Sequence, residues 1–208
     1  KAAVVDTNIF PAGFNNLCKF GSERIPESFK QTILEIVPTC KHILILAENH
    51  TRNTFYLDHL LALKTFLNDA GFEADIAALY NDSNTPFLDL KTTSETSLRI
   101  HNFHTLDLHA HYDFVLLNND LINGIPDVLK ILNIPIYPSY TAGWHSRIKS
   151  EHFKQVNAIM NTVSKTFDLD PFYLTTSFTE VPSCDIQSPA DRHLLYENAM
   201  DLYLKLEH

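Results

Sequence analysis

A polar segment stands between a buried strand and an amphipathic helix, and this junction limits the folds that are open to the chain. The apolar run 42–47 has the length of a buried strand, and leucines at helical spacing follow it over 52–70. The segment 47–56, which joins the strand to the helix, is rich in amide, carboxylate, imidazole and guanidinium groups. Ligands of open α/β sheets bind outside the carboxyl ends of the strands, so the junction predicts one wall of a binding crevice.

Strands and helices alternate along the rest of the chain. Further strands are predicted at 73–80, 87–90, 97–100, 113–118 and 134–137, the last of them at a sheet edge because Pro135 cannot donate to a central ladder. Helices are predicted at 27–37, 52–70, 123–133, 146–167 and from 189 onward. The order predicts an α/β fold of three layers with a mainly parallel sheet. Strands 42–47, 73–79 and 113–118 should be parallel neighbours, with helices 52–70 and 147–166 packed on the sheet.

The 208 residues suffice for one large domain, and we predict a single α/β domain over 1–208. Turn-forming residues make 1–26 an irregular N-terminal segment. The terminal helix 189–208 is expected to lead toward a second domain that is absent from this sequence.

Composition and charge exclude several classes of partner. The net charge of -9, without a basic face, argues against nucleic acid and anionic membranes as partners. No apolar run reaches the roughly 20 residues of a membrane helix, and no signal peptide is recognisable. Three scattered cysteines suggest reduced thiols, hence a cytoplasmic protein. Homo-oligomerisation stays open.

A second polar turn, Asn118-Asn119-Asp120, closes the strand at 113–118 and should face the first one. Glu48, His50 and Asp120 could form an acid–base pair or a metal site. The alternative is that Asn49 or Thr51 caps the helix and that His50 is merely exposed.

Arg52 is predicted to lie in the first turn of helix 52–70, where a cation opposes the helix dipole. An anion held by the helix terminus and Arg52 would resolve this conflict. A third polar stretch, 140–150, offers Trp144 for stacking and Arg147 and Lys149 for anions, although Trp144 could equally be a core anchor.

We expect much of this set to converge in one cleft. The residues predicted to bind substrate are Asn49, His50, Arg52, Asn53, Asn118, Asn119, Asp120, Trp144, Arg147 and Lys149. No catalytic residue is assigned. His101, His104, His109 and His111 could bind zinc if the last two lay on a strand, but their place before the strand favours surface histidines, and no metal site is predicted.

Four segments together carry a family resemblance. The segments 5–17, 48–57, 116–121 and 142–153, in this order and at these separations, resemble the amino-terminal half of the proteobacterial-type glutamate–cysteine ligases. These ATP-dependent enzymes form γ-glutamylcysteine for glutathione biosynthesis. The ATP-grasp-like half of that family, with its phosphate loop and acidic magnesium ligands, has no counterpart here, and only five glycines are present.

The resemblance implies a pre-ATP-grasp, Rossmann-like portion that binds amino-acid substrates. ATP and magnesium would serve the full-length enzyme, with no cofactor in this chain alone. ATP would phosphorylate the side-chain carboxylate of glutamate, and the cysteine amine would attack the acyl phosphate. The alternative is a stand-alone α/β domain that binds a small anionic ligand without catalysis, and a metal-assisted hydrolase using the histidines is a weaker third.

Overall fold

The computed structural model describes residues 10, 12–49, 52–80, 85–143, 148–181 and 184–207. Contacts divide the chain into two compact units, one spanning Asn8–Ser146 and the other including Arg147–His208. Each unit is described by itself below. Because the two units are not placed relative to one another, the single domain expected over 1–208 stays a prediction, and so does the packing of helix 147–166 on the sheet.

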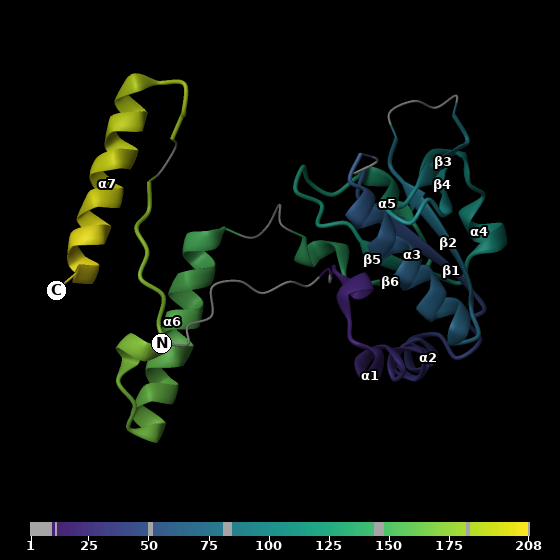
Figure 1. Ribbon diagram of the computed structural model, residues 1–208, viewed down its shortest axis with the longest axis horizontal. Helices are drawn as coiled ribbons and strands as arrows, with labels where there is room; N and C mark the ends of the chain where they lie inside the picture. The colour runs from purple at the N-terminus through teal and green to yellow at the C-terminus, as the bar shows by residue number, and fades with distance from the viewer. Residues whose placement is uncertain are drawn as a thin grey trace. The chain divides into compact units, whose positions relative to one another are not determined.

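The unit Asn8–Ser146 is built on a six-stranded sheet (Figure 1). Its strands are β1 (His42–Ala47), β2 (Glu73–Ala78), β3 (Phe87–Lys91), β4 (Ser97–Asn102), β5 (Phe114–Asn118) and β6 (Ile136–Tyr137). They lie in the order β3-β4-β2-β1-β5-β6. The pair β3–β4 is antiparallel and the other four neighbouring pairs are parallel.

The predicted α/β class and the parallel neighbours are confirmed. β1 lies between β2 and β5, and its last residue, Ala47, pairs with Ala78 on one side and Asn118 on the other. β1 and β5 are buried almost throughout, as apolar runs in a parallel sheet require. β6 is an edge strand, as Pro135 predicted, because a proline cannot donate to a ladder.

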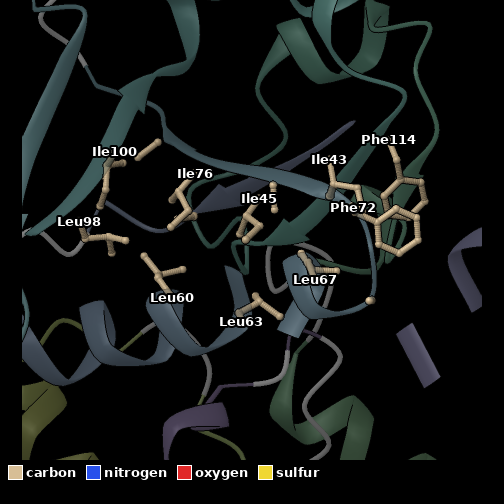
Figure 2. Packing of buried hydrophobic residues seen from close by; sticks show 14 of the residues in the cluster. Ile43, Ile45, Leu60, Leu63, Leu67, Phe72, Ile76, Leu98, Ile100 and Phe114 are labelled. Atoms are coloured by element: carbon tan, nitrogen blue, oxygen red, sulfur yellow. The ribbon is translucent and has the colours of Figure 1, made fainter. Parts of the chain in front are cut away.

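Helices cover both faces of this sheet and complete the three layers. On one face lie α2 (Ile25–Ile36) and α3 (Thr54–Asp69), and on the other α4 (Leu108–His111) and α5 (Asp127–Ile131). Leucines of α3 point toward isoleucines of the sheet (Figure 2): Leu60, Leu63 and Leu67 face Ile43, Ile45 and Ile76. All six are at most 1% exposed, so this interface contributes to the hydrophobic stabilisation of the unit.

The N-terminal segment expected to be irregular is partly helical where the structure describes it. A 3-10 turn, η1 (Phe14–Asn16), is followed by a single helical turn, α1 (Lys19–Ser22), and by the start of α2. Gly13 precedes η1 at φ +80°, a conformation that residues with a side chain rarely adopt. Residues 1–9 and 11 of this segment lie outside the described residues.

The histidine pair His109 and His111 lies in helix α4 and not on a strand, so the condition for a zinc site at this pair is not met. Residues two apart on a helix point about 200° apart, which separates the two rings. Asp107 is the N-cap of this helix, because its side chain accepts the N–H of Ala110. Within the described ranges, no group of three or more His, Cys, Asp or Glu residues is placed to hold a metal ion.

The second unit contains α6 (Lys149–Phe167), the 3-10 turn η5 (Pro171–Tyr173) and α7 (Pro189–Glu207). Asn157 of α6 pairs its side-chain amide with the backbone of Thr176, at 2.8 and 2.9 Å. Asp168 ends α6 in the left-handed conformation at φ +52°. No helix in the described parts of the chain is long and apolar enough to cross a membrane.

Candidate functional site

The crevice between the carboxyl ends of β1 and β5 is the candidate site. From β1 the chain continues through α3 on one face of the sheet, and from β5 it continues through α5 on the other. Connections that leave neighbouring strands on opposite faces open a crevice at their carboxyl ends, where α/β proteins bind ligands. Glu48 follows β1 here, and Asn119 and Asp120 follow β5.

Two carboxyl groups meet at this crevice. The backbone N–H of Asp120 donates to the Oε1 atom of Glu48 at 2.6 Å, and Asp120 Oδ1 accepts the N–H of Ile122 at 3.2 Å. Burial raises the pKa of Glu48 from 4.5 to about 7. The hydrogen bond from the Asp120 backbone opposes this shift, and the hydrogen bond and negative charge of the Asp120 carboxyl add to it. The crevice therefore favours a positively charged or proton-donating ligand group, whereas the sequence suggested an anion.

Asn119 holds the two strand ends together. Its Nδ2 donates to the carbonyl of Ala47 at 3.1 Å, and its Oδ1 accepts the N–H of Leu121 at 2.9 Å. Leu121 is buried and takes the left-handed conformation at φ +54°, which is costly for a branched side chain. Such strained residues persist where the surroundings fix them, often beside functional sites.

Two residues that the sequence analysis missed lie beneath the crevice. Tyr56 and His59 point from α3 toward Asn118, whose Oδ1 lies 3.2 Å from the Tyr56 hydroxyl and 3.0 Å from His59 Nε2. A polar ring such as His59 among the apolar positions Leu57, Leu60 and Leu63 was the available signal. Periodicity marks such residues only as core positions.

The predicted substrate-binding residues do not all fall in this crevice. The structure brings Asn118, Asn119 and Asp120 together with Glu48. Asn49, Arg52 and Asn53 are exposed near the start of α3. His50, Trp144 and Arg147 lie outside the described residues, and Lys149 begins α6 in the other unit. The single cleft uniting the whole set stays a prediction.

The cap of α3 differs from the expected one. Asn53 is the N-cap, and its Oδ1 accepts the N–H of Tyr56 at 3.2 Å, so neither Asn49 nor Thr51 has this role. The helix starts at Thr54, two residues later than predicted. Arg52 therefore precedes the helix, and the argument that it opposes the dipole from within the first turn no longer applies.

We expect Asn53→Ala to lower the free energy of unfolding by about 1 kcal/mol, because the Tyr56 N–H loses its capping partner. This corresponds to a melting temperature lower by about 2–4 °C for a chain of this size. Arg52→Ala, one residue before the cap, is the control and should change stability by less than about 0.5 kcal/mol. Equal melting temperatures for Asn53→Ala and wild type would contradict the cap.

Glu48→Gln should remove a pH dependence of stability. The folded protein holds the Glu48 proton up to about pH 7, while the unfolded chain releases it near 4.5, so ionisation of this group lowers the free energy of unfolding as pH rises between these values. The variant should melt like wild type at pH 4 and above wild type at pH 8. Glu35→Gln, at an exposed position on α2, controls for the lost charge. A difference that shrinks as pH rises would show that the sign is wrong.

An apolar hollow of about 410 Å³ lies beside the crevice, between α2 and the strands β5 and β6. The mostly apolar lining includes Phe29, Ile33, Leu116 and Pro138, and Ser28, Thr32 and Asn118 are polar residues of the same lining. The lining suits an uncharged, apolar group. A charged amino acid therefore fits the crevice better than the hollow.

Comparison with known proteins agrees with this architecture. Residues 1–208 match the glutamate-cysteine ligase family GshA. The fold is similar to the crystal structure of a protein from Methylobacillus flagellatus KT described as a gamma-glutamylcysteine synthetase, with a TM-score of 0.79 and 31% sequence identity. That match covers 98% of this chain and 49% of the other, so the chain spans about half the length of that relative. No curated protein matches. The chain belongs to the glutamate–cysteine ligase family.

Proposed function

We propose that this chain is the amino-terminal, substrate-binding portion of an ATP-dependent glutamate–cysteine ligase that forms γ-glutamylcysteine for glutathione biosynthesis. The observation that carries the proposal is the carboxyl pair of Glu48 and Asp120 at the crevice of a chain that matches this family over its whole length. The portion has a pre-ATP-grasp architecture in this proposal, with an ATP-grasp half supplied by further sequence.

The carboxyl pair suits the α-ammonium group that glutamate and cysteine share. A bound ammonium group would favour the ionised form of Glu48, and a half-buried carboxylate attracts an ammonium group more strongly than an exposed one, because water screens the charges less. Asn118 and Asn119 are already oriented by the hydrogen bonds described above, so the crevice would bind with little rearrangement. Arg52, Asn49 and the other predicted residues remain proposed contacts for the substrate carboxylates.

ATP and magnesium would be held elsewhere in the full-length enzyme. The described crevice presents carboxylates, which repel a triphosphate, and the sequence has no glycine-rich phosphate loop. When bound, ATP supplies the phosphoryl group that activates a carboxylate. This chain would contribute the binding and orientation of an amino acid, which raises the effective concentration of the reacting groups.

The free cysteines Cys18, Cys40 and Cys184 fit a reducing compartment, and we place the enzyme in the cytoplasm. The rival function, a stand-alone domain for a small anionic ligand, receives less support because Glu48 and Asp120 would repel an anion.

The test is an assay for γ-glutamylcysteine with a protein that joins this chain to the further half that its relative carries. Product formation that requires ATP, L-glutamate and L-cysteine together would support the proposal. A well-folded two-half protein that forms no product with these substrates would overturn it.

A further inference from the structure

Tyr56 joins the two strand ends at the crevice. Its hydroxyl accepts the backbone N–H of Glu48 at 2.8 Å. The same hydroxyl lies 3.1 Å from the carbonyl oxygen of Asn118 and 3.2 Å from its Oδ1, and its single proton can serve either acceptor. One phenol on α3 therefore fixes the residue after β1 relative to the last residue of β5.

His59 extends these hydrogen bonds from Asn118 to the backbone of Phe14, and the bonds that connect Glu48, Tyr56, Asn118, His59 and Phe14 are called the relay below. Its Nδ1 accepts the backbone N–H of Phe14 at 3.3 Å, so the neutral ring carries its proton on Nε2 and donates to Asn118 Oδ1 at 3.0 Å. A second proton on Nδ1 would face the N–H of Phe14. Burial also lowers the pKa of His59, so the ring stays neutral and acts as a fixed donor.

The relay bears directly on the carboxyl pair. Tyr56 holds the backbone of Glu48, and the backbone of Asp120 holds the Glu48 carboxyl group. Both ends of Glu48 are thus tied to neighbours that the fold keeps in place. A shift of the Tyr56 hydroxyl would move Glu48 relative to Asp120 and admit water between the two strand ends.

Stability alone gives little reason for polar rings at these positions. His59 is only 2% exposed, and its helix neighbours Leu57, Leu60 and Leu63 are buried leucines packed in the core. Replacing buried hydrogen-bonded partners by apolar groups of the same shape is often nearly neutral in stability. A fully satisfied polar network does, however, specify one arrangement of its members.

We propose that Tyr56 and His59 are positioning residues of the amino-acid site: together with Asn118 they hold Glu48 beside Asp120, so that the crevice is preorganised for a substrate ammonium group. The role in substrate binding rests on the proposed ligase function. The positioning of Glu48 rests on the geometry of the relay and is tested separately.

The first test follows the titration of Glu48 in the 208-residue chain, by the carboxyl carbon shift in a ¹³C-glutamate sample with Glu48 assigned. Tyr56→Phe removes the hydroxyl and should move the pKa of Glu48 down toward its ordinary value, because water reaches the relaxed strand ends. Tyr112→Phe is the matched control. The Tyr112 hydroxyl donates to Asp75 Oδ2 at 3.2 Å and makes no bond to the residues of the crevice described above. A folded Tyr56→Phe with unchanged Glu48 titration, or equal shifts in both variants, would overturn the positioning role.

The second test asks whether position 59 needs a hydrogen-bond donor or only a side chain of similar size. It uses the two-half enzyme, the protein that joins this chain to the further half that its relative carries. The amide of His59→Gln can still donate to Asn118 Oδ1, whereas His59→Leu cannot. We expect His59→Leu to raise KM for L-glutamate or L-cysteine about tenfold, as for one lost hydrogen bond, and His59→Gln to stay within about threefold. The same KM for both variants would contradict the proposal. If His59→Leu fails to fold, the Tyr56→Phe titration decides.

The two tests keep the claims apart. A wild-type two-half enzyme that makes no γ-glutamylcysteine refutes the proposed function, while the Glu48 titration still decides whether Tyr56 positions the carboxyl pair. Melting temperatures of all variants identify any change that reflects unfolding.

Discussion

The 208-residue chain by itself is expected to form no γ-glutamylcysteine from ATP, L-glutamate and L-cysteine. A protein that also carries the further half found in its relative should turn over at about 1 per second or faster, a typical enzyme rate. The reason is the absence of a phosphate-binding loop in a sequence with five glycines, together with an acidic crevice that repels a triphosphate. Product quantified by mass spectrometry measures both rates.

A thermal melt of the isolated chain is the necessary control, because an unfolded chain would be inactive for a trivial reason. L-glutamate added during the melt should raise the melting temperature of the folded chain if the crevice binds it without ATP. Turnover by the isolated chain at about 1 per second would contradict this prediction and place an ATP site within these 208 residues.

Ile45→Ala should lower the free energy of unfolding by about 2–5 kcal/mol, the range for an aliphatic residue truncated in a packed core. Ile45 is fully buried in the central strand β1 and faces Leu60 and Leu63 of α3 (Figure 2). Its loss leaves a cavity between sheet and helix that a parallel strand with neighbours on both sides cannot close. Urea denaturation followed by circular dichroism measures the change.

Ile131→Ala is the matched control, because this isoleucine of α5 is 80% exposed. It should alter stability by less than about 0.5 kcal/mol. A loss below about 1 kcal/mol for Ile45→Ala would mean that the interface between α3 and the sheet is loosely packed, contrary to the burial of its leucines and isoleucines.

Local sequence determined the strands β1 and β5 and the helix α3 of the unit Asn8–Ser146. The run 42–47 and the centre of 113–118 are apolar and too short for a typical helix, which favours strands buried on both faces, and the structure confirms β1 and β5 there. The leucine spacing of 52–70 determined α3 within two residues at each end. The polar turns after these two strands then indicated the crevice, because ligands of α/β folds bind at the carboxyl ends of neighbouring strands.

The tertiary structure decided which side chains meet and what charge they present. The sequence offered two interpretations, a group of Glu48, His50 and Asp120 and an anion held by Arg52. The structure joins Glu48 to Asp120, which are 72 positions apart, by a hydrogen bond. Tyr56 and His59 were indistinguishable from core residues in sequence, because periodicity reports which face is buried and not what it touches. Their bonds to Asn118 span 62 and 59 positions and depend on how α3 crosses the ends of β1 and β5, a geometry that only the packing of helix on sheet sets.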